Sequence, residues 1–81
     1  MIKVLFFAQT RELLGRDEIT VEPSFNNVEE LRSHLAAQNE RWALALQKDK
    51  LLVAVNQTLV SLDSPLSDAD EVAFFPPVTG G

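Results

Sequence analysis

The apolar run Val72 to Phe75 is followed by two consecutive prolines, Pro76 and Pro77. Proline has no amide hydrogen and a fixed φ, so a β-strand over residues 71–75 must end at Phe75. Pro77 also holds Pro76 in an extended conformation. The chain continues with Val78, Thr79, Gly80 and Gly81. An extended segment over residues 76–81 can span roughly 20 Å. We therefore predict a folded domain over residues 1–75 and an extended Gly-Gly tail over residues 76–81.

The tail ends without side chains, so the α-carboxylate of Gly81 is the functional group that it offers. Small residues at a C-terminus are common and often have no function. A tip without Cβ atoms on a Pro-Pro spacer can also enter a narrow channel and bring its carboxylate into the active site of a partner. The spacer favours the second interpretation.

The composition restricts the class of function. The chain has 81 residues and no cysteine, which fits one small domain and excludes disulfides and thiolate metal sites. A single histidine, His34, is too few for a nucleophilic triad or a histidine-rich metal site. The formal charge of −5 disfavours nucleic acid and anionic membranes and favours a partner with a basic face. No apolar run approaches membrane-spanning length, so we predict a cytoplasmic protein without a metal site.

Hydrophobic periodicity and turn residues predict an α+β domain with five strands. We expect strands over residues 2–7, 17–22, 51–55, 58–61 and 71–75, the first two as antiparallel neighbours. Residues 8–14 predict a short helix ending at Gly15, and Asn56-Gln57 predicts the turn between the third and fourth strands. Residues 62–70 predict an irregular turn. Its aspartates fit the capping of backbone amides and do not match a calcium loop.

One longer helix is predicted between the second and third strands. Asn27 is a favoured N-cap, and Glu30 three residues later completes a capping box. The helix should finish near Asn39. Its buried stripe is formed by Val28, Leu31 and Leu35. A second short helix is expected over residues 40–46, with Trp42 as a core or lid residue.

Side-chain alternation indicates an apolar surface patch. If Glu71 faces solvent, Phe75 shares its phase, and the same reasoning places Phe7 outside on the first strand. Leu59 can join them from the fourth strand. Exposed apolar side chains of this kind usually mark a partner surface. The alternative is that a short helix or loop covers these residues within the monomer, and the pattern alone leaves both open.

The terminal Phe-Phe-Pro-Pro-Val-Thr-Gly-Gly, preceded by Asp-Ala-Asp-Glu-Val, resembles the small, sulfur-carrying subunits of molybdopterin synthase. The resemblance extends to residues 3–8, to residues 28–35 and to Val55-Asn56. One departure is Ala69, where this family often has glycine. The resemblance implies a ubiquitin-like β-grasp fold, a mixed five-stranded sheet packed on one main helix with short extra helices.

The resemblance also implies a chemistry. An activating enzyme of the ubiquitin-activating type adenylates the Gly81 carboxylate with ATP, and sulfur from a persulfide donor displaces AMP to leave a thiocarboxylate. The tail, Pro76, Pro77, Val78, Thr79 and Gly80, inserts into the large subunit, where the sulfur attacks cyclic pyranopterin monophosphate to build the dithiolene. Phe7, Leu59 and Phe75 dock both partners in turn. On this resemblance the chain binds no cofactor, is no enzyme on its own and assembles with the large subunit as a heterotetramer.

Other interpretations stay open. A sulfur carrier of the thiamine pathway also has a β-grasp fold with a terminal Gly-Gly, although the Phe-Phe-Pro-Pro-Val lead-in favours the molybdopterin family. A ubiquitin-like modifier that is conjugated to lysines, or an interaction module with an idle tail, is a further alternative.

Overall fold

The structure, a computed structural model, describes residues 1–77. In chain order its elements are β1 (Ile2–Phe6), α1 (Ala8–Leu14), β2 (Glu18–Val21), α2 (Val28–Ala36), α3 (Glu40–Ala45), the 3₁₀ helix η1 (Lys48–Lys50), β3 (Leu52–Val55), β4 (Thr58–Val60) and β5 (Glu71–Phe75). Among these described residues, no helix is both long enough and apolar enough to span a membrane.

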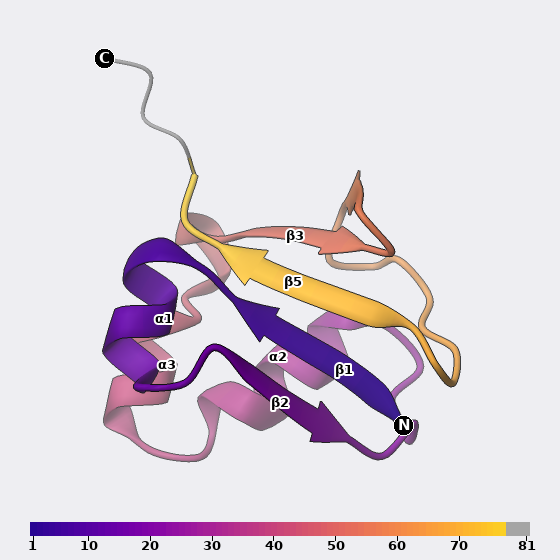
Figure 1. Ribbon diagram of the computed structural model, residues 1–81, viewed down its shortest axis with the longest axis horizontal. Coiled ribbons are helices and arrows are strands. Elements are labelled where there is room, and N and C mark those ends of the chain that lie inside the picture. The colour runs from indigo at the N-terminus through magenta and orange to yellow at the C-terminus, as the bar shows by residue number, and fades with distance from the viewer. Residues whose placement is uncertain (78–81) are drawn as a thin grey trace.

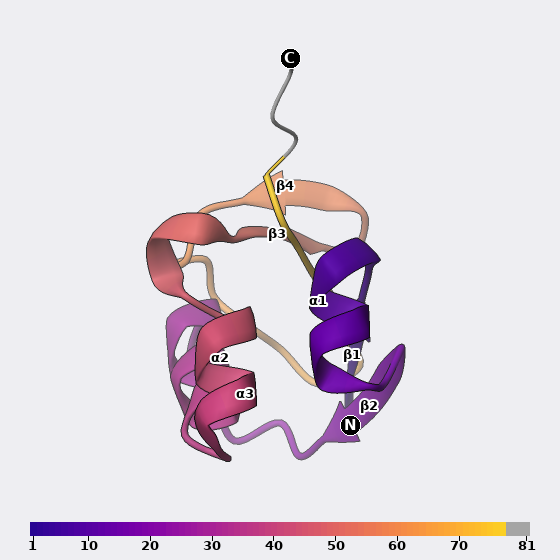
Figure 2. The same cartoon turned by 90° about the vertical axis from the view of Figure 1, so that its left-hand side faces the viewer.

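The five strands form one mixed sheet in the order β2-β1-β5-β3-β4. β1 and β5 run parallel in its middle, whereas β1–β2, β5–β3 and β3–β4 are antiparallel. The predicted pairing of the first two strands is confirmed. In Figure 1 α2 and α3 lie behind the sheet, and in Figure 2 they lie to one side of it, so one face is covered by these helices.

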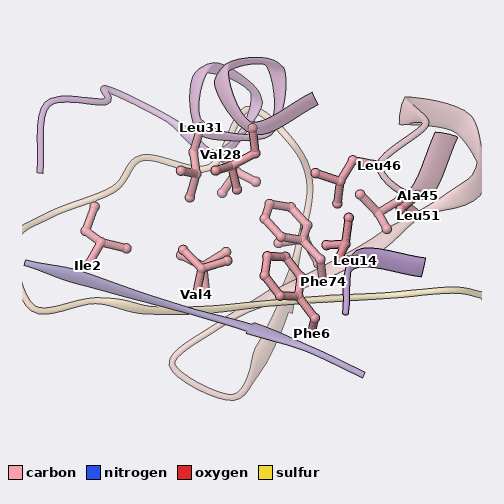
Figure 3. Close-up of a cluster of buried hydrophobic side chains, with 13 residues drawn as sticks. Ile2, Val4, Phe6, Leu14, Val28, Leu31, Ala45, Leu46, Leu51 and Phe74 are labelled. Carbon is pink, nitrogen blue, oxygen red and sulfur yellow. The ribbon is translucent and has the colours of Figure 1, made fainter. Parts of the chain in front are cut away.

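The core lies between the sheet and these helices. Phe6 of β1 and Phe74 of β5 are buried with their rings stacked, 6.4 Å between centroids, and Figure 3 shows them facing Leu31 of α2 and Leu46, the residue after α3. Trp42 is half-buried and meets Phe6 edge-on at 5.8 Å. It therefore closes the core as a lid, one of the two roles predicted for it.

α2 begins as predicted and ends earlier. The Asn27 side chain accepts a hydrogen bond from the Glu30 amide, and Val28, Leu31 and Leu35 are buried. The Glu30 carboxylate accepts from the Asn26 amide at 2.9 Å, so the return bond of the capping box is shifted by one residue. The prediction that α2 finishes near Asn39 was wrong by three residues, because Asn39 has an extended backbone and caps α3 by accepting from the Trp42 amide.

Several strand ends also differ from the prediction by a residue. β1 ends at Phe6; Phe7 keeps an extended backbone and donates its amide to the Phe74 carbonyl, but α1 begins at the next residue. η1 was not predicted, and it delays the start of β3 to Leu52. α1 ends at Gly15, whose φ of 69° is left-handed, as expected for a residue that closes a helix. Asn56 and Gln57 both have positive φ, which is the tight turn that suits a two-residue hairpin.

β5 covers Glu71–Phe75 as predicted. Pro76 and Pro77 follow it outside the sheet, and in Figure 1 they leave the end of β5 in the direction away from the helices. Val78, Thr79, Gly80 and Gly81 lie outside the described residues. The division into a domain over residues 1–75 and an extended tail over residues 76–81 therefore stays a prediction.

Candidate functional site

The strand register places one apolar row across the middle of the sheet. Leu5 of β1 lies opposite Ala73 of β5, Ala73 lies opposite Ala54 of β3, and Ala54 lies opposite Leu59 of β4. Residues that are directly opposite in neighbouring strands share a face. The residues before and after them in β1 and β5 are buried against the helices, so this row lies on the other, helix-free face.

A second row lies beside the first, toward the end from which the tail leaves. Phe75 of β5 is opposite Leu52 of β3, and the Phe7 amide donates to the Phe74 carbonyl, which keeps Phe7 next to β5. Phe7 is 46% exposed, Leu52 37% and Leu59 65%. We call the two rows together the apolar face, which consists of Leu5, Phe7, Leu52, Ala54, Leu59, Ala73 and Phe75.

The apolar face contains a shallow hollow of about 830 Å³. Its floor includes the alanine pair Ala54 and Ala73, and Leu5, Gln57 and Glu71 also line it. Since alanine ends at Cβ, the pair leaves space between the larger side chains around it.

The root of the tail is part of the same hollow. Phe7, Phe75, Pro76 and Pro77 line it together, although Phe7 and Phe75 are far apart in the sequence. The chain thus leaves the sheet at the rim of an open apolar surface, and any protein that holds residues 76 and 77 is brought against that surface.

A hydrogen-bond network holds the start of β5 to the β3–β4 turn. The Asn56 side chain donates to the Asp70 carboxylate at 3.0 Å and accepts from the Glu71 amide at 3.0 Å. The Asn56 amide donates to the Glu71 carbonyl at 2.7 Å, and the second oxygen of Asp70 accepts from the Ser67 amide at 2.8 Å. The predicted capping role is confirmed for Asp70. The network fixes the position of the strand that leads to the tail.

Ala69, the departure noted in the sequence, has a left-handed backbone with φ of 73°. Its amide donates to the Met1 carbonyl at 3.1 Å, and the neighbouring Asp68 carboxylate pairs with the Met1 amino group. That ammonium, through its hydrogen bond and its charge, lowers the pKa of Asp68. Both contacts join the turn before β5 to the start of β1.

The best-formed ion pair lies away from the hollow, within α2, and one of its partners also reaches the end of α3. Arg32 donates to both oxygens of Glu29, at 2.7 and 2.8 Å, and to the Leu46 carbonyl at 2.7 Å. The hydrogen bond from Arg32 lowers the pKa of Glu29, and the same bond raises the pKa of Arg32. This cluster fastens helices together and offers no reactive group. Within residues 1–77, no group of histidine and acidic side chains is arranged to hold a metal ion.

The structure brings together two of the three predicted patch residues, Phe7 and Phe75, with the prolines of the tail. Leu59 does not line the hollow, but it is highly exposed and extends the row that forms the floor. The alternative that a helix or loop of the monomer covers the patch does not hold for Phe7 and Leu59, which are 46% and 65% exposed in the described chain. Gly81, Gly80, Thr79 and Val78 lie outside the described residues.

Sequence reasoning missed Leu5, Leu52, Ala54 and Ala73. Leu5 shares the phase of Phe7, and Ala73 shares the phase of Phe75, so the alternation could have found both. Ala54 and Leu52 become recognisable once the register of β3 on β5 is known.

The sheet order, the parallel pair of first and last strands and the helix across one face define a ubiquitin-like β-grasp domain, here with an open apolar face. A solved structure from Pyrococcus furiosus, described as a putative molybdopterin converting factor subunit 1, shares this fold. It has a TM-score of 0.78 and 33% identity, and the match covers 95% of this chain and 97% of that one.

The comparisons with known proteins then identify the family. The ThiS family model matches residues 4–81. The molybdopterin synthase sulfur carrier subunit of Escherichia coli is 70% identical over 81 residues, all of both chains. In a solved complex of subunits 1 and 2 of the molybdopterin-converting factor from Helicobacter pylori, one chain is 28% identical with a TM-score of 0.68, and the match covers 99% of this chain and 97% of that one. The chain belongs to the ThiS family.

Proposed function

We propose that the chain is the sulfur carrier subunit of molybdopterin synthase. The observation that carries this proposal is the 70% identity with the Escherichia coli carrier subunit along the whole of both chains. The Gly-Gly terminus and the proline spacer, on which the chemistry depends, lie within that match.

In this proposal the reactive group is the Gly81 carboxylate. A carboxylate accepts sulfur poorly until adenylation turns one oxygen into part of a good leaving group, AMP. The activating partner uses ATP for that step. The outer sulfur of a persulfide donor then displaces AMP to give an acyl disulfide, and a second thiol cleaves its S–S bond, forming a disulfide and releasing the thiocarboxylate. Its sulfur is a nucleophile that attacks cyclic pyranopterin monophosphate, so that one difficult transfer is divided into two easier ones. The chain itself has no cysteine that could hold sulfur.

The domain supplies binding and positioning, and its partners supply catalytic side chains and ATP. The large synthase subunit and the adenylating enzyme are the proposed partners, and Phe7, Leu59 and Phe75 are the proposed contacts. The complex of subunits 1 and 2 in the Helicobacter pylori structure supports the first of these partners. Residues 76–80 form the proposed inserting segment, and Pro76 and Pro77 support this by lining the same hollow as Phe7 and Phe75. The cytoplasmic location stays a prediction.

The test is reconstituted sulfur transfer. The chain is loaded by its activating enzyme, ATP and a sulfur donor, and is then mixed with the large subunit and cyclic pyranopterin monophosphate. We expect molybdopterin to form with the wild type, and an intact mass that shows one oxygen replaced by sulfur after loading. The chain without Gly81 should fold equally well by circular dichroism and give no product. Product from that variant would refute the proposal.

The same material separates the alternatives. Stable association with the large synthase subunit supports the synthase carrier. A ubiquitin-like modifier would instead become attached to lysines of many proteins when incubated with a cell extract and ATP, and a carrier of the thiamine pathway would load with sulfur but produce no molybdopterin.

A further inference from the structure

The alanine pair in the floor of the hollow is the feature that the proposed function leaves unexplained. Ala54 and Ala73 lie opposite each other in the antiparallel pair of β3 and β5, and both are half-buried. Alanine is depleted in strands because β-branched and aromatic side chains pack better on a pleated surface. Two alanines side by side in the middle of a sheet therefore forgo contacts that valine or isoleucine would make.

Larger side chains surround the pair. In the same row Leu5 lies on one side and Leu59 on the other, and Phe75 and Leu52 form the next row. Of these four, Leu5 and Phe75 line the hollow together with the pair. The pair is thus the low point of an apolar surface with higher edges, which is the shape of a socket. An open apolar socket in contact with water is unfavourable unless a side chain fills it.

The position of the socket favours one kind of occupant. Pro76 and Pro77 line the same hollow as the alanine pair, so a protein that receives the tail is brought next to the pair. Central, well-packed pockets are where a few large side chains contribute most of the affinity of an interface. Glu71 and Gln57 at the edge supply polar groups around the apolar floor, as is usual for the rim of an interface.

We propose that Ala54 and Ala73 form a socket for one large apolar side chain of the large synthase subunit, and that their small size determines whether that subunit docks. The inference rests on the proposed function, because it takes the receiver of the tail as its occupant. It adds two specificity-determining positions that carry no chemistry and do not belong to the exposed patch predicted from the sequence.

The test fills the socket without weakening the strand. Isoleucine is favoured in strands, so Ala73→Ile should fold at least as well as the wild type, as checked by its melting temperature. It should weaken binding to the purified large subunit by about 10- to 100-fold, the usual effect of overfilling a packed site. Ala73→Ser adds only one heavy atom and should weaken binding less than Ala73→Ile does, because its cost is the burial of a hydroxyl and not excess volume.

Thr20→Ile is the matched control. Thr20 is an exposed residue of β2 that pairs with Lys3 on the same face of the sheet, outside the hollow. It should leave the affinity unchanged. A second set of variants truncates the large apolar side chains on the docking surface of the large subunit to alanine, one at a time. One of these should bind Ala73→Ile more tightly than it binds the wild type.

The outcomes separate this inference from the proposed function. If Ala73→Ile binds the large subunit as tightly as the wild type or Thr20→Ile does, the socket is refuted. A wild type that still transfers sulfur would then uphold the carrier role. If the wild type neither binds the large subunit nor transfers sulfur, both fail together. Leu59 is exposed enough to enter the socket of a second copy, so sedimentation of the wild type alone is also measured. If the wild type forms a dimer and Ala73→Ile dissociates it, the occupant of the socket is a second copy of this chain and not the large subunit. That result would overturn the inference.

Discussion

Replacing Ala69 by glycine should stabilise the protein. Ala69 has φ of 73° in the turn before β5. A left-handed backbone brings Cβ close to the following carbonyl oxygen, at a cost of roughly 1–2 kcal/mol. Glycine avoids that contact but loses about 0.4–1 kcal/mol, because the unfolded chain gains freedom. The difference lies between about 0 and 1.6 kcal/mol, and its midpoint predicts that Ala69→Gly raises the free energy of unfolding by about 0.8 kcal/mol.

Urea denaturation, followed by far-ultraviolet circular dichroism and analysed by linear extrapolation, measures this change. In a domain of this size the melting temperature should rise by about 2–8 °C. The amide of residue 69 keeps its hydrogen bond to the Met1 carbonyl, and the change lies outside the hollow, so sulfur transfer should be unaffected.

Two further substitutions serve as controls of opposite sign. Gly15 has φ of 69°, and a Cβ added there would meet nothing within 4 Å. Gly15→Ala therefore adds backbone strain without a clash of the new Cβ, and after the gain from the less free unfolded chain is subtracted it should destabilise by about 0.5–1 kcal/mol. Ala37 is exposed with an ordinary φ of −79°, so Ala37→Gly should destabilise through the unfolded chain alone. If Ala69→Gly destabilised the protein as Ala37→Gly does, the assignment of strain to Ala69 would be wrong.

Three further predictions concern the apolar face, acid stability and the start of β5. Phe75→Glu places a charge at the hollow and should weaken binding of the large subunit by about tenfold or more in titration calorimetry, since burying an unpaired carboxylate is costly. Leu44→Glu, at an exposed leucine of α3, is the control and should leave the affinity unchanged. Equal affinities of the two variants would contradict the role of Phe75. Because the hydrogen bond from the guanidinium lowers the pKa of Glu29 in the folded state, its stabilisation is present above the ordinary pKa of 4.5 and is lost as pH falls below it. Glu29→Gln should therefore reduce stability at neutral pH and less in acid, and a stability profile parallel to the wild type between these conditions would contradict the assignment. Asn56→Gly keeps the positive φ and removes the side-chain bonds to Asp70 and to the Glu71 amide, so it should cost about 1–2 kcal/mol in urea denaturation; an unchanged midpoint would show that the network does not stabilise the fold.

Much of the fold could be predicted because its signals are local. The cap at Asn27, the stripe of α2 and the stop after Phe75 each depend on residues within a few positions of one another. The end of α2 was harder, because Asn39 can continue one helix or cap the next. Asparagine is compatible with either role, and the hydrogen bond that its side chain accepts from the Trp42 amide makes it the cap of α3.

The apolar face was only partly predictable. Phe7 and Phe75 are recognisable as large apolar residues on the polar phase of a strand. The alanines are not, because their contribution is the space that they leave. That space exists where Ala54 meets Ala73, and the meeting depends on a register between strands that are distant in sequence. The role of Gly81 is inferred from resemblance and relationship, since it lies outside the described residues.

The place of β5 in the sheet has a consequence for how the protein is made. β5 is the last strand to be synthesised, yet it lies between β1 and β3 and buries Val72 and Phe74 in the core. Without β5, the β1–β2 pair and the β3–β4 pair are two halves of the sheet that share no ladder. The two halves are joined when β5 pairs with β1 and β3. The pairing of β5 with β1 closes a loop of nearly the whole chain, and such long-range pairing is slow in folding. A prematurely ended chain would therefore lack the strand that joins the halves, and only a fully translated molecule can offer its terminus from a finished fold.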